Sequence, residues 1–340
     1  MASPGDQAPA ELTALLERMG VACAVVETKE QGKHVKALAD FAEGAELFEE
    51  APIVAWPIHA SDGSLDPKTF CDGCMRAVAS GSSVACDGCR DAVYCTVECQ
   101  ARAGPAHSFL CKKLAALRGF HAAEAASTSG AAPISAESVA RCVATIAVRY
   151  LRLKAQNPDA SPAELFVYAA HAFNRLLEPP VSATFEDADP AKWAGIVRRV
   201  MEPTLAANLP PSAVEGLLSD ETIRTLLGEL TINAQGLFVK PAEDSAAAPV
   251  HAAGVFTIQS CFNHSCCPNA RVRCGTNSDI TLEMIKPVKA GEEITISYLP
   301  PLVLELEPVA KRNERLKPYF FTCRCPKCTS ELAAAAASRE

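Results

Sequence analysis

Hydrophobic and polar positions along the chain follow two different periods. Near the N-terminus and again in the last third, apolar residues alternate with polar ones over short runs, which is typical of half-buried strands. We expect a short helix at 10–20 and strands at 21–26, 53–56, 271–274, 280–284 and 294–298. Glu43-Gly44 and Lys289-Ala290-Gly291-Glu292 read as turns that enter strands. The β-like part of the chain therefore comes in two blocks.

The middle of the chain follows the helical period instead. Between Glu137 and Lys154, apolar side chains share one face at 3.6-residue spacing: Val139, Cys142, Val143, Ile146, Tyr150 and Leu151. Ser161-Pro162-Ala163-Glu164 is a capping box that opens a helix to about Leu177. We expect further helices from Asp189-Pro190 and from Ser219. Low-complexity residues at 121–135 and 242–253 predict a linker and a loop. The fold class is α+β.

Composition limits the kind of protein. The chain has 340 residues, of which 49% are hydrophobic and 21% charged, as in ordinary globular proteins. No apolar run reaches the roughly 20 residues of a membrane helix, and the first residues do not resemble a signal peptide. We expect a monomer in the nucleus and cytoplasm, without membrane contact. The net charge of −8 argues weakly against direct nucleic-acid binding and suits a basic protein or peptide partner.

Sixteen cysteines in a reducing compartment favour metal sites over disulfides. Between residues 71 and 111, two CxxC pairs, a CxxxC and an HxxxC supply enough ligands for two closed zinc sites. The segment is too poor in large apolar residues to fold on core burial alone, so metal must substitute for a core. The eight ligands are Cys71, Cys74, Cys86, Cys89, Cys95, Cys99, His107 and Cys111.

A second group of motifs lies in the last third. Asn263-His264-Ser265-Cys266 is followed by Pro268-Asn269, and then by Gly291-Glu292-Glu293 leading to Tyr298. Each element alone is a weak signal, since an Asn-His pair is usually a turn and a strand-end tyrosine is usually a packing residue. Their order and spacing, together with the closing Cys323-x-Cys325-x2-Cys328, make a chance arrangement improbable.

Together these motifs resemble lysine methyltransferases whose SET domain is split by a MYND zinc finger. The resemblance implies a SET-type β-fold of short strands, interrupted by the finger and a helical insertion. It places SET segments at 1–70 and 231–300, the MYND finger at 71–111, a linker and helical insertion at 112–230, a post-SET zinc segment at 301–330 and a disordered tail at 331–340.

The family's metal sites carry over residue by residue. The resemblance implies one zinc ion on Cys71, Cys74, Cys95 and Cys99, a second on Cys86, Cys89, His107 and Cys111, and a post-SET zinc on Cys266, Cys323, Cys325 and Cys328. All three ions would be structural, because every coordination position is taken by protein. The finger would serve either as a rigid prop for the catalytic core or as a site for a proline-rich partner peptide.

The cofactor implied by the resemblance is S-adenosylmethionine, whose polar edges need side-chain and backbone anchors rather than a phosphate loop. The implied anchors are Lys33, His34, Asn233, Asn263, His264, Tyr298 and Phe321. A substrate lysine has a pKa near 10.4 in water, and a desolvated, aromatic-lined channel would lower that pKa. Tyr298 would be the catalytic tyrosine, which orients the amine without acting as a base.

The chain departs from the family pattern at three places. Gly32-Lys33-His34 stands where the family has Gly-x-Gly, so a side chain occupies a position of close approach to the cofactor. Cys267 replaces an acidic residue. Only twelve residues follow Cys328, which predicts that the helical C-terminal domain of longer members is missing and that the substrate groove is more open. Two interpretations stay open: a protein-lysine methyltransferase acting on histones or other basic proteins, and an inactive SET–MYND adaptor, which His34 would favour.

Overall fold

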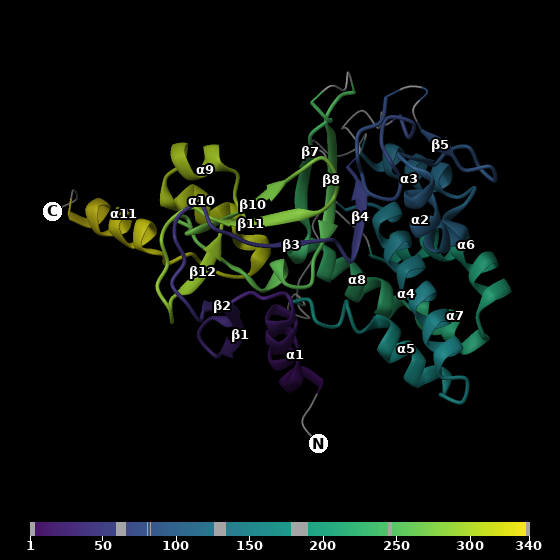
Figure 1. Cartoon of the computed structure of the whole chain (residues 1–340), viewed down its shortest axis with the longest axis horizontal. Coiled ribbons are helices and arrows are strands. Elements are labelled where there is room, and N and C mark those ends of the chain that lie inside the picture. Colours follow the sequence, from purple (N-terminus) through teal and green to yellow (C-terminus); the bar gives the residue numbers. More distant parts are fainter. Residues whose placement is uncertain are drawn as a thin grey trace. The chain divides into compact units, whose positions relative to one another are not determined.

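The computed structural model describes residues 4–58, 66–79, 81, 83–125, 134–177, 190–243 and 247–337. The chain divides into two units (Figure 1): residues 1–50, 257–273 and 280–340 form the first, and residues 51–256 and 274–279 the second. Each unit gathers segments that are far apart in the sequence. An interrupted domain, as the motifs predicted, has this organisation.

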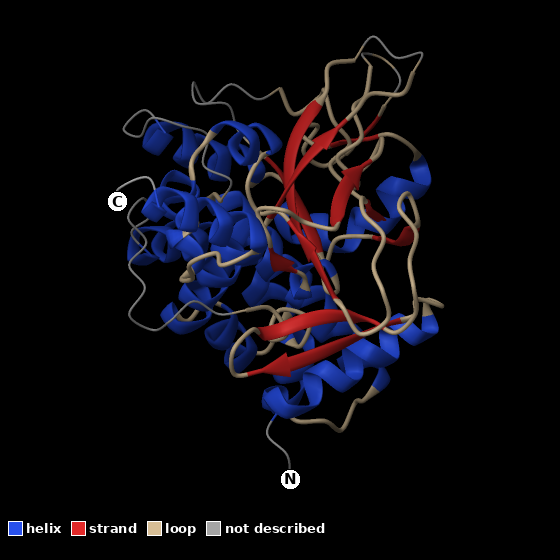
Figure 2. Ribbon diagram, turned by 90° about the vertical axis from the view of Figure 1, so that its left-hand side faces the viewer, coloured by secondary structure: helices blue, strands red, loops and turns tan. Residues whose placement is uncertain are grey.

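Two small sheets form the β part of the first unit. The strands are β1 (Cys23–Thr28), β2 (Gly32–Ala37), β3 (Glu46–Glu50), β9 (Asn263–His264), β10 (Ala270–Cys274), β11 (Ile280–Met284) and β12 (Glu293–Ile296). Their orders are β1-β2-β12-β9 and β10-β11-β3. The β1–β2 hairpin lies alongside helix α1 (Pro4–Arg18) in Figure 2, and the Thr13 hydroxyl bonds the backbone of Val25. The strands expected from alternation are therefore present, with ends shifted by a few residues.

Short helices close the first unit around its C-terminal cysteines. They are η1 (Gln259–Cys261), α9 (Pro301–Leu306), α10 (Val309–Arg315), η2 (Lys317–Tyr319) and α11 (Pro326–Ala337). Leu299 and Leu316 are buried among Cys266, Cys323 and Cys328. Helix α11 extends through most of the segment that we expected to be a disordered tail. Alanine has the highest helix propensity, which explains this difference.

The second unit joins two small sheets to a helical bundle. Its strands are β4 (Val54–Pro57), β5 (Val84–Ala85), β6 (Val93–Tyr94), β7 (Gln235–Val239) and β8 (Val250–Val255), paired as β4-β8-β7 and β5-β6. Its helices are α2 (Val97–Leu110), α3 (Leu114–Ala125), α4 (Ala136–Gln156), α5 (Pro162–Ala170), α6 (Pro190–Asn208), α7 (Pro211–Leu217) and α8 (Asp220–Asn233). Helix α4 is the central helix, and its apolar face is buried against α6 and α8.

Helix starts in this unit agree with the capping signals in the sequence. Ser161 and Glu164 form the expected capping box, and the Ser219 hydroxyl accepts from the Thr222 N–H at the start of α8. Two expectations were wrong in extent. Helix α5 ends at Ala170 rather than near Leu177, and strand β8 occupies the end of the segment expected to be a loop. No helix among the described residues is long and apolar enough to cross a membrane.

Candidate active site and zinc centres

Backbone pairing fixes the Asn263–His264 segment in the first unit. Strand β9 runs parallel to β12, with Asn263 opposite Thr295 and His264 opposite Ile296. Just upstream, the Glu50 carboxylate accepts from the N–H groups of Ile258 and Gln259 at 2.8 and 2.9 Å. These bonds satisfy backbone donors at the start of η1 that have no helical partner. The segment is therefore held from both ends.

The Asn263 side chain has a defined orientation. Its Nδ2 donates to the Gln31 carbonyl at 3.1 Å and to the Glu293 carboxylate at 3.0 Å. Both hydrogen bonds use the amide nitrogen, so the amide oxygen stays available to accept from the amino group of a bound amino acid. Glu293 also accepts from the Gln31 amide at 2.7 Å. Sequence reasoning placed Glu293 in the motif but gave it no role; the structure shows that it orients Asn263.

Asn269 locks the same strands together. Its Nδ2 donates to the Glu293 carbonyl at 2.9 Å, and its Oδ1 accepts from the Thr295 N–H at 2.7 Å. A side-chain amide in this position replaces a neighbouring strand, because it satisfies both a backbone acceptor and a backbone donor. This explains structurally why an asparagine follows Pro268.

His264 bridges two parts of the site. Its Nδ1 accepts from the Tyr298 N–H at 2.9 Å, and its Nε2 lies 3.3 Å from Cys266 Sγ. Because the backbone N–H can only donate, a neutral ring must carry its proton on Nε2, facing the sulfur. Burial, with a smaller contribution from Arg312, lowers the pKa of His264 to about 4. The ring is therefore neutral at physiological pH, and it connects the tyrosine backbone to a cysteine of the C-terminal cluster.

Tyr298 lies at the centre of an aromatic group. Its ring centroid is 4.9 Å from Tyr319, 5.3 Å from His264 and 6.3 Å from Phe321. The hydroxyl donates to the Phe262 carbonyl at 2.8 Å. Burial, followed by the nearby Tyr319, raises the pKa of Tyr298 well above its usual range. Tyr298 is therefore a neutral phenol with a fixed hydroxyl direction, and it does not supply a phenolate base near pH 7.

Phe321 comes to this group through an unusual turn. Phe320 has a left-handed backbone at φ 60°, a conformation uncommon outside glycine, at the end of η2. The Phe321 ring lies 5.9 Å from His264, and the residue is 37% exposed. A partly exposed ring beside His264 can stack on a planar ligand.

His34 fits the strand without strain. Gly32 adopts the left-handed conformation at φ +62°, whereas neither Lys33 nor His34 is among the residues with positive φ. His34 is fully buried, pairs with Val26 across the hairpin, and its Nδ1 lies 3.0 Å from the Gly32 carbonyl. Its Nε2 is buried without a hydrogen bond among the described residues. The first glycine of the family pattern thus meets the backbone requirement, and the second position accepts a side chain.

Asn233 lies in the second unit, at the end of α8. Its amide nitrogen donates to the carbonyls of Leu177 and Glu229, both at 2.8 Å, and its oxygen accepts from the Leu177 N–H at 3.2 Å. These bonds tie residue 177 to the helix end. A role for Asn233 at the cofactor stays a prediction.

The structure gathers the metal-ligand candidates into three clusters, in the combinations that the resemblance implies: Cys71, Cys74, Cys95 and Cys99; Cys86, Cys89, His107 and Cys111; and Cys266, Cys323, Cys325 and Cys328. Within each cluster the ligand atoms lie within 4.8 Å of one another. Sulfurs bound at about 2.3 Å to a tetrahedral zinc stand roughly 3.8 Å apart. The Cys71–Cys99, Cys74–Cys95 and Cys86–Cys111 distances are 3.4, 3.7 and 3.9 Å. The clusters therefore fit three zinc ions.

Neighbouring charges differ between the clusters in a way that suits zinc. Four thiolates and Zn²⁺ carry a net charge of about −2, whereas three thiolates and a histidine carry about −1. Each four-cysteine cluster receives an arginine: Arg102 donates to Cys99 Sγ at 3.6 Å, and Arg312 to Cys328 Sγ at 3.4 Å. At the mixed cluster, a carboxylate, Asp72, faces the histidine instead.

Comparison with known proteins agrees with the site. Residues 241–299 match the SET domain model and residues 71–111 the MYND finger model. The chain therefore carries both domains that give the SET and MYND domain-containing proteins their name. These matches, together with the relatives below, support S-adenosylmethionine-dependent methyltransferase chemistry. The side chains around Asn263 and Tyr298 fit that cofactor, because they offer an amide oxygen and a partly exposed aromatic residue, Phe321, rather than phosphate ligands.

Alignments with related proteins cover most of the chain. It is 26% identical over 318 residues to "Histone-lysine N-methyltransferase ASHR2" of Arabidopsis thaliana, covering 91% of this chain and 72% of that protein. It is 25% identical over 304 residues to human "N-lysine methyltransferase SMYD2", covering 88% of this chain and 59% of that protein. Among solved structures, the SET domain of LSMT bound to lysine and AdoHcy aligns with a TM-score of 0.35 at 11% identity, over 92% of this chain and 56% of that one. This last likeness is too weak to support a conclusion.

Proposed function

We propose that this SET–MYND protein is a protein-lysine N-methyltransferase that acts on a histone or another basic protein. The observation that carries the proposal is the arrangement around Tyr298. A neutral phenol with a fixed hydroxyl lies among aromatic rings, and its backbone is bonded to the histidine of the Asn263–His264 segment. This arrangement suits the transfer of a carbon group to an amine, because the amine is itself the nucleophile and the site would need only to position it.

S-adenosylmethionine, when bound, supplies an electrophilic methyl group on a sulfonium. The chain's own residues would anchor it: the Asn263 amide oxygen for the amino group, His264 through its backbone, Lys33 and His34 from strand β2, and Phe321 for the adenine. Asn233 would add a second amide.

The substrate amine must reach the site without its proton, and an aromatic, water-poor channel favours the neutral form. The proton leaves to solvent, since the phenol of Tyr298 stays protonated. The O–H of Tyr298 donates to the Phe262 carbonyl, and the hydroxyl oxygen keeps lone pairs that can accept from the amine N–H. This contact would orient the nitrogen lone pair toward the methyl carbon for in-line displacement.

The proposed partners follow from charge and from the finger. A net charge of −8 suits a basic protein substrate. The MYND finger is proposed to contact another protein, with a proline-rich peptide as the candidate ligand. We propose that the protein works as a monomer in the nucleus and cytoplasm.

Calorimetric titration of S-adenosylmethionine into zinc-loaded protein tests the cofactor site. We expect micromolar binding that Asn263→Ala abolishes and that Asn277→Ala, whose amide bonds Asp279 in the other unit, leaves intact. The same protein with methyl-labelled cofactor and a panel of core histones should transfer label to lysine.

The adaptor alternative predicts the opposite result. A folded protein with three bound zinc ions that takes up no cofactor would overturn the enzyme proposal and leave a partner-binding role. Cofactor binding without transfer to any basic protein would keep the site but reject the substrate class.

A further inference from the structure

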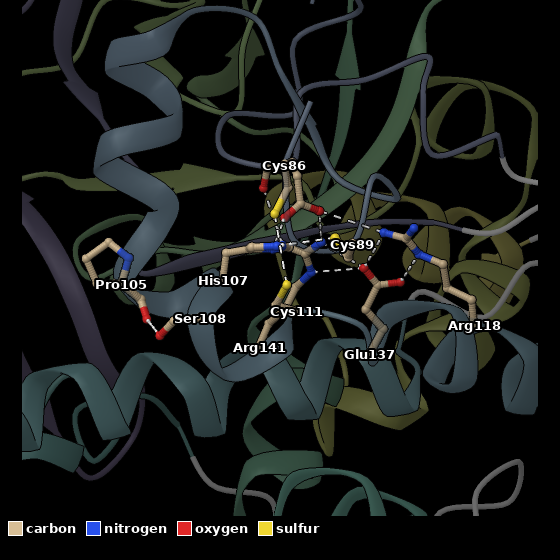
Figure 3. A network of polar contacts seen from close by, with 10 residues as sticks. Cys86, Cys89, Pro105, His107, Ser108, Cys111, Arg118, Glu137 and Arg141 are labelled. Atoms are coloured by element: carbon tan, nitrogen blue, oxygen red, sulfur yellow. Dashed lines mark hydrogen bonds and ion pairs between the residues drawn. The ribbon is translucent and has the colours of Figure 1, made fainter. Parts of the chain in front are cut away.

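A line of buried charged side chains extends from a zinc ligand of the finger into the helical insertion (Figure 3). His107 lies on α2, Asp72 lies between the first two cysteines of the finger, and Glu137 and Arg141 lie one turn apart on α4. All four are at most 6% exposed. Charged side chains are seldom buried to this degree unless they are paired, so this line needs a physical explanation.

The line begins at the imidazole of His107. Its Nε2 lies 3.5 Å from Cys89 Sγ, so this nitrogen faces the metal cluster. Its Nδ1 is buried and has no hydrogen bond among the described residues, and the Oδ2 atom of Asp72 faces it at 3.6 Å. In zinc proteins a carboxylate on the outer nitrogen fixes the tautomer and the direction of a ligating histidine. Asp72 is placed for this role.

Helix α4 holds the other oxygen of Asp72. Arg141 Nη2 donates to Asp72 Oδ1 at 2.5 Å, and Nη1 donates to the Asp72 carbonyl at 3.4 Å. The same guanidinium donates to Glu137 Oε1 through Nε at 3.0 Å and through Nη2 at 2.8 Å. Asp72 and Arg141 are 69 residues apart in the sequence. The direction of Asp72 is therefore set by a helix outside the finger.

Arg118 of α3 completes the charge balance. Its Nε and Nη2 donate to Glu137 at 2.8 and 3.0 Å, and its guanidinium lies 5.8 Å from the centre of the Phe70 ring. The two carboxylates are thus matched by two guanidiniums, while the zinc cluster adds a charge of about −1. Removal of either arginine would leave an uncompensated carboxylate next to an anionic metal centre, which is costly in a buried site.

We propose that Asp72 is a positioning residue for the zinc ligand His107, and that Arg141 holds Asp72, so that the second zinc of the finger and helix α4 stabilise each other. The finger then depends on the helical insertion for full stability, since a residue of α4 holds the carboxylate that orients one of its zinc ligands. This inference concerns zinc retention and does not depend on methyl transfer.

Zinc release from the full chain to a chromogenic chelator tests the proposal. We expect Asp72→Ala and Arg141→Met to release one of the three zinc ions ten- to a hundredfold faster than the unaltered protein, with the other two unchanged. Cys86→Ser, which removes a ligand of that centre, identifies the ion concerned. Arg141→Lys keeps the charge but loses the forked geometry of the guanidinium, so its zinc-release rate should lie between those of the unaltered protein and Arg141→Met.

Two arginine variants are matched controls. Arg152→Met lies on the exposed side of α4 and should release all zinc at the normal rate. Arg102→Met removes the donor to Cys99 Sγ in the other finger cluster, so it should speed the release of a different zinc ion. A normal release rate in Arg141→Met, or equal acceleration of all three ions, would overturn the proposal.

Arg141→Met could fail to fold, so a second measurement works from the metal side. Hydrogen exchange followed by mass spectrometry on Cys86→Ser should show lost protection in the first turns of α4, around residues 136–145. Protection in the later turns, up to Gln156, should change less. Unchanged exchange at the start of α4 after loss of the second zinc would contradict the mutual stabilisation.

Discussion

At the scale of single residues, the hydroxyl of Tyr298 is the group whose loss should be most informative. Tyr298→Phe keeps the ring packing against Tyr319 but leaves the buried carbonyl of Phe262 without its donor. We expect a loss of about 1 to 3 kcal/mol in the free energy of unfolding and a fall in kcat of roughly a hundredfold or more. Urea unfolding and methyl-transfer kinetics measure the two effects.

The matched control for this substitution is Tyr319→Phe. Its ring also packs on Tyr298, but its hydroxyl has no hydrogen bond in the described structure. If both variants lose activity equally, the fixed Tyr298 hydroxyl is not the feature that matters.

His264 should connect the C-terminal zinc centre to the tyrosine. His264→Ala removes the acceptor of the Tyr298 N–H and the donor that faces Cys266 Sγ. We expect faster release of the zinc held by Cys266, Cys323, Cys325 and Cys328, by about tenfold or more. Chelator-driven release reports this directly. An unchanged rate would show that His264 supports the tyrosine without stabilising the metal centre.

The zinc ligands could be predicted from the sequence because cysteines and a histidine recur there at the short spacings typical of zinc sites. The residues that orient the site could not. Glu293 orients Asn263 from 30 residues away, and Gln31 does so from 232 residues away. Asp72 and Arg141 look like ordinary surface charges until the fold brings them together. A carboxylate or guanidinium has no sequence pattern that distinguishes a buried, paired role from a solvated one.

At the scale of elements, Glu50 links strand β3 to the segment that carries η1. Burial raises the pKa of this carboxyl from 4.5 to about 7, and the N–H groups of Ile258 and Gln259 only partly offset it. The folded state therefore binds the proton more tightly than the unfolded state, and stability falls as pH rises from about 4.5 to about 7.

Glu50→Gln isolates this effect. Between pH 6 and pH 8 the unaltered protein should lose about 1 kcal/mol of unfolding free energy relative to the variant. The variant should be less sensitive to pH, although it loses one of the acceptors for the backbone donors. Urea titrations at constant zinc measure the two slopes. Parallel slopes would mean that Glu50 does not titrate in this range.

Helices were easier to predict than strands, for a physical reason that strand β8 illustrates. The Ser161 and Ser219 caps are local signals, because the hydroxyl bonds a backbone N–H three residues ahead. Strand β8 lies between β4 and β7 and is buried at all but one position, so it lacks an alternating pattern. Its alanines and glycine also have low β-propensity. Pairing with distant strands determines its conformation, and that information is absent from its own sequence.

At the scale of the whole molecule, the metal centres are divided between the two units. The cluster of Cys266, Cys323, Cys325 and Cys328 belongs to the first unit, whereas both finger clusters belong to the second. Structural zinc contributes directly to the folding free energy of the part that encloses it. Each zinc should therefore protect its own unit.

Two serine substitutions test this division. Cys325→Ser should increase hydrogen exchange in α10 and α11 and leave the start of α4 protected, and Cys86→Ser should do the reverse. The lower-melting transition should belong to the altered unit in each variant, because the lost zinc stabilised that unit alone. The Cys325→Ser variant should also lose methyl transfer, since Cys266 of the same cluster faces His264 and His264 bonds the Tyr298 backbone. Equal loss of protection in both units from either substitution would mean that the chain unfolds as one cooperative body.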